Sequence, residues 1–217
     1  MHAHLASPFW TTITRFGEAG ILLPCAALIA VGLLATTREW RAAAAWVLPL
    51  GIAVAVTTAS KIAFLGFGLG IASLDFTGFS GHAMFAAAVY PMLAWALMGR
   101  GRPRLRAVVI AFAYALAALV AVSRVRVDAH SPSEIVLGFT LGALASAAAM
   151  HALREGAEFT LPPVLAGVLA LWLGLMPHEP VLLPSHEIVT RVSLKLSGRT
   201  KPFTRADLHR KGLPSLG

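Results

Sequence analysis

The chain has 217 residues, of which 57% are hydrophobic and only 13% are charged, and this composition excludes an ordinary soluble domain. A mean hydropathy of +0.74 also excludes a disordered or fibrous protein. The formal charge of +8 is a weak indication of nucleic acid, because basic residues in so apolar a chain orient loops and contact anionic lipid. We therefore expect a polytopic membrane protein with no nucleic-acid partner.

Six apolar intervals without Asp, Glu, Lys or Arg approach or reach the length of about 20 residues that a membrane-spanning helix needs. They run from Ala19 to Thr37, Ala42 to Ser60, Phe76 to Gly99, Ala107 to Ser123, Ile135 to Leu153, and Phe159 to His178. The predicted fold class is therefore all-α, a bundle of six transmembrane helices with both termini on one side. The first interval follows the acidic Glu18 instead of a basic cluster, so we expect an uncleaved helix. It contains Cys25, the single cysteine, so the chain has no intrachain disulfide and no CxxC metal site.

A shorter apolar interval, from Ile62 to Leu74, carries Gly66, Gly68 and Gly70 and cannot span a membrane. We interpret it as an extension of the second helix followed by a re-entrant or interfacial loop. The glycines in this loop could leave room for the hydrocarbon chain of a lipid.

Residues 1–184 are predicted to form the transmembrane domain, with its catalytic motifs between residues 61 and 138, and residues 185–217 a basic tail. Within the tail, Val189, Val192 and Leu196 recur at helical spacing. This pattern favours a solvated or headgroup-bound segment over a catalytic one.

Arginines in two short loops set the predicted orientation. Arg38 and Arg41 join the first and second helices. The third and fourth helices are joined by a loop that contains Arg100, Arg102, Arg104 and Arg106. Short loops rich in Arg and Lys stay in the cytoplasm. The loops at 61–79 and 124–133 then share the outer face, which in a bacterial inner membrane is the periplasmic or exterior side.

Ser80, Gly81 and His82 open the third predicted helix. Ser is a favoured N-cap, Gly permits close backbone approach, and the free N–H groups of a helix start attract anions such as phosphate. His82 on the first turn can give or take a proton. The alternative is a simple helix cap beside an interfacial histidine, and these residues alone favour neither interpretation.

Ser123 and Arg124 end the fourth predicted helix, and Glu134 comes four residues after His130. At this helical spacing the carboxylate can accept a hydrogen bond from one ring nitrogen of His130, which leaves the other as a nucleophile. However, residues 131–134 also form a good capping box, with Ser131 as N-cap and Glu134 at N3. Taken alone, the pair slightly favours the cap.

The meeting of these groups on one membrane face favours phosphoryl chemistry. Cations such as Lys61 and Arg124 neutralise phosphate oxygens, one histidine attacks phosphorus, and a second protonates the leaving oxygen. The HExxH and cysteine-pair spacings of zinc sites are absent, and the neighbouring cations would repel a divalent ion. We therefore expect no metal and no cofactor.

At these residues the sequence resembles the type 2 phosphatidic acid phosphatase (PAP2) family of membrane lipid phosphate phosphatases. The family's third motif, S-R-x5-H-x3-D, is matched from Ser123 to Glu134 with Glu in place of Asp. Its second motif, P-S-G-H, is matched at residues 79–82 with Phe in place of Pro. Its first motif, K-x6-R-P, keeps Lys61, but Gly68-Leu69 stands where the family has Arg-Pro.

The resemblance implies a role for each matched residue. His130 would be the nucleophile that forms a phosphohistidine, Glu134 its orienting carboxylate, and His82 the general acid. The phosphate cradle implied by the motifs consists of Lys61, Ser80, Gly81 and Arg124. Arg126 is a candidate to replace the missing arginine, and Asp75 is a candidate to position Lys61 or Arg126.

The predicted function is metal-independent hydrolysis of a phosphomonoester or pyrophosphate on a membrane lipid, with the bilayer and the lipid substrate as the only inferred partners. The fitting substrates include phosphatidic acid, phosphatidylglycerol phosphate, undecaprenyl pyrophosphate and lipid A phosphates. The alternatives are a phosphotransferase that uses the same histidine and a catalytically weakened lipid-binding protein. A transporter is disfavoured because the two halves show no convincing internal similarity.

Overall fold

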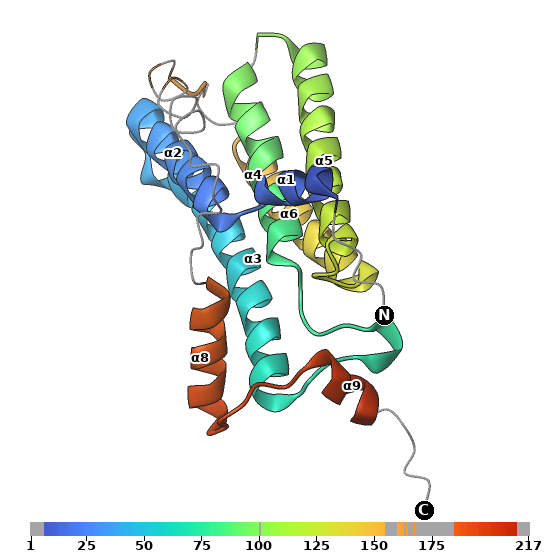
Figure 1. Ribbon diagram of the computed structural model, residues 1–217. Helices are drawn as coiled ribbons and strands as arrows, with labels where there is room; N and C mark the ends of the chain where they lie inside the picture. The colour runs from blue at the N-terminus through green and yellow to red at the C-terminus, as the bar shows by residue number, and fades with distance from the viewer. Residues whose placement is uncertain are drawn as a thin grey trace, which may run out of the picture.

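The computed structural model describes residues 7–99, 101–154, 160–162, 164, 167 and 185–211. Its helices are α1 (Pro8–Arg15), α2 (Ala19–Thr37), α3 (Trp40–Phe67), α4 (Gly81–Met98), α5 (Pro103–Arg126), α6 (Pro132–Ala152), α8 (Ser185–Ser197) and α9 (Arg205–Lys211), with a short 3-10 turn η1 (Ala72–Leu74). Within these described ranges the only β contact is an isolated bridge between Ile71 and Phe76. The all-α prediction is confirmed (Figure 1).

Five helical segments of the described chain are long and apolar enough to cross a membrane. They are Pro8–Thr37, Trp40–Phe67, Gly81–Met98, Pro103–Arg126 and Pro132–Ala152. Each contains one of the first five predicted spans, or most of it, and α2 has the predicted bounds. The sixth predicted span, Phe159 to His178, lies almost entirely outside the described residues, so the number of six stays a prediction.

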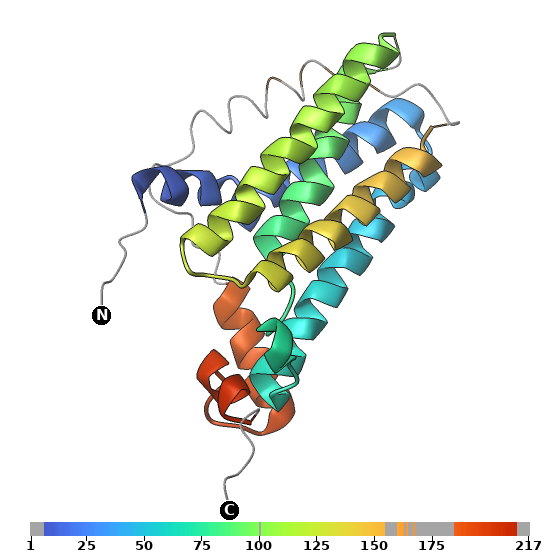
Figure 2. The ribbon, with the colours of Figure 1, turned by 90° about the vertical axis from the view of Figure 1, so that its right-hand side faces the viewer.

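Helix α4 is the centre of the bundle and packs against α2, α5 and α6 (Figure 2). Two glycines one turn apart on α6 explain the close packing of α6 on α4. A Cβ atom on Gly138 would lie 2.6 Å from the carbonyl oxygen of Ser80, and one on Gly142 would overlap the carbonyl group of Met84. The glycines therefore allow the start of α4 to lie close to the start of α6, as small residues do between membrane helices.

Helix α3 continues past Lys61 to Phe67 and ends at Gly68, which has the left-handed φ of +68° that favours glycine. The predicted helix extension is therefore correct. The space beside two of its glycines is filled by protein, because a Cβ on Gly66 would lie 2.8 Å from the carbonyl oxygen of Ser193, and one on Gly70 would lie 2.9 Å from Cδ1 of Leu208. Protein instead of a lipid chain occupies these positions.

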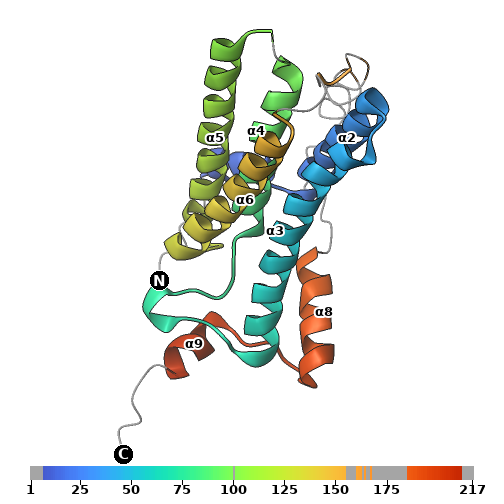
Figure 3. The same ribbon diagram turned by 180° about the vertical axis from the view of Figure 1, so that it is seen from behind.

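The C-terminal segment, residues 185–211, is docked on the bundle. Figures 1 and 3 show α8 alongside the C-terminal half of α3, and α9 beside the loop that joins α3 to α4. Ser193 is fully buried, Leu208 is 6% exposed, and the Phe203 N–H donates to the carbonyl oxygen of Leu65 at 2.9 Å. The segment is thus packed against the protein, because Gly66 and Gly70 leave room for it. The predicted solvated or headgroup-bound segment did not include this packing. The predicted domain boundary at residue 184 lies outside the described residues and stays a prediction.

The connecting loops are divided between the two ends of the bundle. The loop between α3 and α4, the loop between α5 and α6, and the C-terminal segment lie at one end, and the connection between α2 and α3 lies at the other (Figure 1). This arrangement agrees with the predicted pairing of the loops at 61–79 and 124–133. Helix α1, which the sequence did not predict, packs against α5 (Figure 2).

Candidate active site

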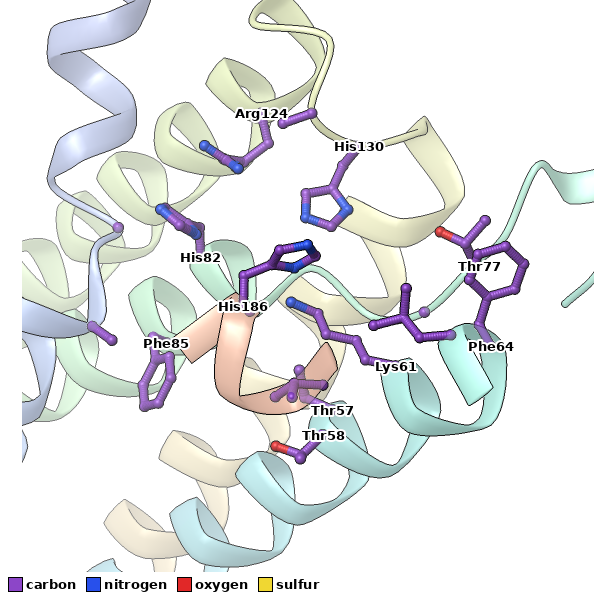
Figure 4. A pocket seen from close by; sticks show the side chains of 17 residues that line it. Thr57, Thr58, Lys61, Phe64, Thr77, His82, Phe85, Arg124, His130 and His186 are labelled. Atoms are coloured by element: carbon purple, nitrogen blue, oxygen red, sulfur yellow. The ribbon is translucent and has the colours of Figure 1, made fainter. Parts of the chain in front are cut away.

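A pocket of about 450 Å³ lies at the loop-rich end of the bundle. Figure 4 shows the side chains that line it. The residues that line it include Lys61, Gly81, His82, Arg124, His130 and His186. The first five were predicted from sequence and come from α3, α4, α5 and the loop before α6, so the fold brings together groups that are up to 69 residues apart in the chain (130 − 61). His186, which the sequence assigned to the tail, was missed.

His130 and Glu134 form the predicted pair. Glu134 is fully buried, and its Oε2 lies 2.7 Å from Nδ1 of His130. An ionised carboxylate only accepts hydrogen bonds, so this contact assigns the proton to Nδ1 and leaves the lone pair on Nε2. Figure 4 shows the ring of His130 directed into the pocket, on the side opposite to His82.

The same carboxylate also caps α6. The Ser131 hydroxyl accepts from the Glu134 N–H at 3.4 Å, and the Ser131 N–H donates to Oε2 of Glu134 at 3.1 Å, which completes the capping box. The sequence set the cap and the histidine pair against each other, but a carboxylate offers enough lone pairs for both. The other oxygen, Oε1, accepts from the N–H of Thr77 at 2.7 Å and from its hydroxyl at 2.5 Å.

Arg205 of α9 completes the surroundings of Glu134 and was not predicted from the sequence. Its Nη2 lies 3.0 Å from Oε1 and 2.9 Å from Oε2 of Glu134. The other guanidinium nitrogen, Nη1, is 2.5 Å from Oδ2 of Asp75, and Oδ1 of Asp75 lies 2.8 Å from Nε2 of His209. Asp75 therefore contacts Arg205 and His209 in place of the predicted Lys61 or Arg126. The sequence gives one indication of such an arginine: the first motif lacks its Arg, and the distant C-terminal tail is strongly basic.

The start of α4 has the properties of an anion site. The Ser80 N–H donates to the carbonyl oxygen of Glu134 at 3.1 Å. The buried Ser80 hydroxyl has no hydrogen-bond partner in the described part of the chain. A Cβ on Gly81 would lie 3.8 Å from Nζ of Lys61, so the lysine charge lies over the first turn. Free N–H groups, a free hydroxyl and a cation together suit phosphate oxygens.

Arg124 is fixed from the N-terminal side. Its Nη1 donates to the hydroxyl of Thr14 on α1 at 2.7 Å, and its buried Nε finds no hydrogen-bond partner among the described residues. An unused buried donor of this kind is costly unless a ligand accepts from it. Arg126, the candidate replacement for the missing arginine, instead lies over the ring of Trp10 at 5.7 Å and does not line the pocket.

The electrostatic surroundings favour the neutral form of His130. Burial lowers the pKa of His130 below its ordinary value, and Lys61 and Arg124 act in the same direction, while the hydrogen bond to Glu134 opposes them. A neutral imidazole is the nucleophilic form. No group of three or more His, Cys, Asp or Glu side chains in the described ranges is placed to hold a metal ion.

These features define the class as an α-helical membrane protein with a pocket lined by histidines and cations. The sequence model of the PAP2 superfamily matches residues 71–156. An uncharacterised 22.5 kDa protein in the cps region of Klebsiella pneumoniae is 36% identical over 206 residues, which cover 93% of this chain and 98% of the relative. The chain belongs to the PAP2 superfamily.

A solved structure agrees with this assignment. The crystal structure of a transmembrane PAP2-type phosphatidylglycerolphosphate phosphatase from Bacillus subtilis superposes with a TM-score of 0.54 at 25% identity, over 70% of this chain and 81% of that one. The chain therefore has the fold of a PAP2 membrane phosphatase.

Proposed function

We propose that this protein hydrolyses a phosphomonoester or pyrophosphate on a membrane lipid through a phosphohistidine, without a metal ion. The observation that carries the proposal is the pair of His130 and the buried Glu134, beside a pocket that His130 lines together with Lys61, His82 and Arg124. A nucleophile, an acid and two cations in one cavity are the groups that phosphoryl transfer needs.

In the proposed first step, Nε2 of His130 attacks phosphorus and the bond from phosphorus to the leaving oxygen breaks. His82 gives its proton to that oxygen, so the leaving group departs as an alcohol or a phosphate monoester. Lys61, Arg124 and the start of α4 at Ser80 and Gly81 hold the phosphoryl oxygens.

In the second step, water attacks the phosphorus of the phosphohistidine. His82 takes a proton from this water, the bond between phosphorus and Nε2 breaks, and inorganic phosphate leaves. Both histidines then have their starting protonation states. Throughout, Glu134 holds Nδ1–H of His130 and stabilises the positive charge that the ring gains when it is phosphorylated.

The place of the pocket suits a lipid substrate. It lies at one end of helices that cross the membrane, so the hydrocarbon chains of a lipid can stay in the bilayer while the phosphate reaches His130. The arginine-bearing loop between α2 and α3 lies at the opposite end. By the positive-inside rule that end is cytoplasmic, which puts the pocket on the periplasmic or exterior side of a bacterial inner membrane.

The direct test measures phosphate release by the purified protein from phosphatidic acid, phosphatidylglycerol phosphate, undecaprenyl pyrophosphate and lipid A. The wild type should hydrolyse at least one of them, and His130→Ala should lose several orders of magnitude in rate. His151→Ala, an exposed histidine at the far end of α6, is the matched control and should keep its activity. A His130→Ala variant as fast as the wild type would contradict the proposal.

A further inference from the structure

The C-terminal segment presents one arginine to the buried carboxylate in a fixed geometry. Arg205 begins α9, whose first turn is capped by Thr204 and Asp207. The Thr204 hydroxyl lies 2.7 Å from Oδ2 of Asp207, and the Asp207 N–H donates back to that hydroxyl at 3.3 Å. Leu208, which is 6% exposed, anchors the helix to the bundle. The backbone of Arg205 is therefore held independently of its own side-chain contacts.

The guanidinium of Arg205 is held at both ends of its planar fork. Nη1 lies 2.5 Å from Oδ2 of Asp75 and 2.7 Å from its backbone oxygen, while Nη2 contacts both oxygens of Glu134 at 2.9 and 3.0 Å. Arginine suits such a bridge because its donors are rigid and always charged. Lysine has a single nitrogen and could not span the two carboxylates in the same way.

Arg205 does not line the pocket, and it contacts the site through Glu134 and, at 3.4 Å, through the hydroxyl of Thr77, which itself donates to Glu134. Glu134 is fully buried, and a buried carboxylate without a cationic partner is unfavourable. Lys61 and Arg124 lie within the pocket, where a phosphate would engage their charges. Because Arg205 lies outside the pocket, a bound phosphate would not compete with Glu134 for its charge.

We infer that Arg205 is a positioning residue of the phosphatase, which bridges Asp75 and Glu134 so that Glu134 holds His130 in the Nδ1–H form and in the orientation for attack. This inference rests on the proposed function. The C-terminal segment is then part of the catalytic apparatus, although it lies outside the matched superfamily region of residues 71–156.

The bridge also tunes the charge that His130 experiences. In the wild type, the positive charge of Arg205 offsets the negative charge of Glu134. When Arg205 is removed, the uncompensated carboxylate favours the protonated form of His130, which is not a nucleophile. Lys61, Arg124, His82 and His186 still face the ring in the variant, so a change in the pH profile reports the loss of Arg205. A purely structural role would leave that profile in place.

The test compares kcat, KM and the pH profile of the wild type and Arg205→Ala on the best lipid substrate. We expect kcat to fall by about 10-fold to 100-fold, as for other groups that orient a catalytic residue, with KM nearly unchanged. The acidic limb of the kcat profile should move to higher pH. Added guanidinium ion should restore part of kcat, because it can occupy the vacated site.

Arg210→Ala is the matched control, since Arg210 is on the same helix, its side chain is 76% exposed, and its ion pair is with Asp207 at 3.7 Å. Its kinetics should equal those of the wild type. Arg205→Lys keeps the charge and guards against a folding defect in the alanine variant; we expect an intermediate kcat. Wild-type kcat and pH profile in Arg205→Ala, or wild-type kcat in Arg205→Lys, would overturn the inference.

His130→Ala, measured in the same assay, separates this inference from the proposed function. An inactive wild type or an active His130→Ala would overturn the proposed function, and the inference with it. An inactive His130→Ala beside a fully active Arg205→Ala would overturn the inference alone.

Discussion

The proposed catalytic groups and the C-terminal segment that contacts them come from two regions with different packing. His82 and Glu134 belong to α4 and α6, whose backbones touch at Gly138 and Gly142 inside the bundle. The C-terminal segment is laid on the outside of α3, and α8 keeps exposed apolar side chains such as Leu196, which is 64% exposed. The side chains of the proposed chemistry therefore lie in the more tightly packed region, and the C-terminal segment contacts that region from outside. Substitutions in the first region should then have the larger effects.

The largest effect is expected for Glu134→Gln. The amide group would donate to Nδ1 of His130 and force the proton onto Nε2, the attacking atom, which in a comparable triad costs about 10⁴-fold in kcat. The measurement is the rate of phosphate release from a lipid substrate.

Ser131→Ala is the control for this variant, because it removes the cap but keeps the carboxylate. It should lower stability by about 1 kcal/mol and leave most of the activity. Near-normal activity in Glu134→Gln would show that the carboxylate serves only the cap.

His82→Ala should lose about 10²-fold to 10⁴-fold in the rate of phosphohistidine formation, the usual contribution of a general acid. The loss should shrink for a substrate whose leaving group needs no proton, such as an aryl phosphate with an acidic phenol. Rapid-quench kinetics with both substrates checks this prediction. An equal loss for the two substrates would contradict the role of His82 as the acid.

Gly66→Val tests the docking of the C-terminal segment. A Cβ at this position would lie 2.8 Å from the carbonyl oxygen of Ser193, so α8 must shift, at a cost of about 1 to 3 kcal/mol. We expect faster hydrogen exchange in residues 185–211 and a fall in kcat that is smaller than for His82→Ala. Gly51→Val, on the same helix but with nothing within 4 Å, is the matched control. Unchanged exchange in Gly66→Val would contradict the observed packing.

The smallest effect is expected for Arg126→Ala. Its guanidinium stacks on Trp10, a contact worth about 0.5 to 1 kcal/mol, and does not line the pocket. Arg124→Ala should raise KM because it removes a phosphate contact, whereas Arg126→Ala should leave KM in place. Equal increases of KM in the two variants would show that Arg126 also contacts the phosphate.

The features that sequence could predict are local in the chain. The apolar intervals gave five of the spans, and His130 and Glu134 are four residues apart, so helical periodicity alone brings them together. The two interpretations of Glu134 could not be separated by sequence, since both place the carboxylate at the same turn.

The features that sequence missed are contacts between distant residues. Arg205 reaches Glu134 across 71 positions and Arg124 reaches Thr14 across 110, and neither pair has a periodic pattern. The docking of α8 depends on the absence of a side chain at Gly66. In the sequence, the same glycine was interpreted as room for a lipid chain. His186 reaches the pocket only because of that docking.

The most direct measurement of the central claim is to trap the phosphorylated protein. The wild type is mixed with a lipid substrate, quenched in alkali to preserve phosphohistidine, and analysed by mass spectrometry and ³¹P NMR. We predict one phosphate on Nε2 of His130, absent in His130→Ala and accumulated in His82→Ala when the substrate has a good leaving group. Phosphate on His82 or His186, or turnover without any phosphorylated protein, would contradict the claim.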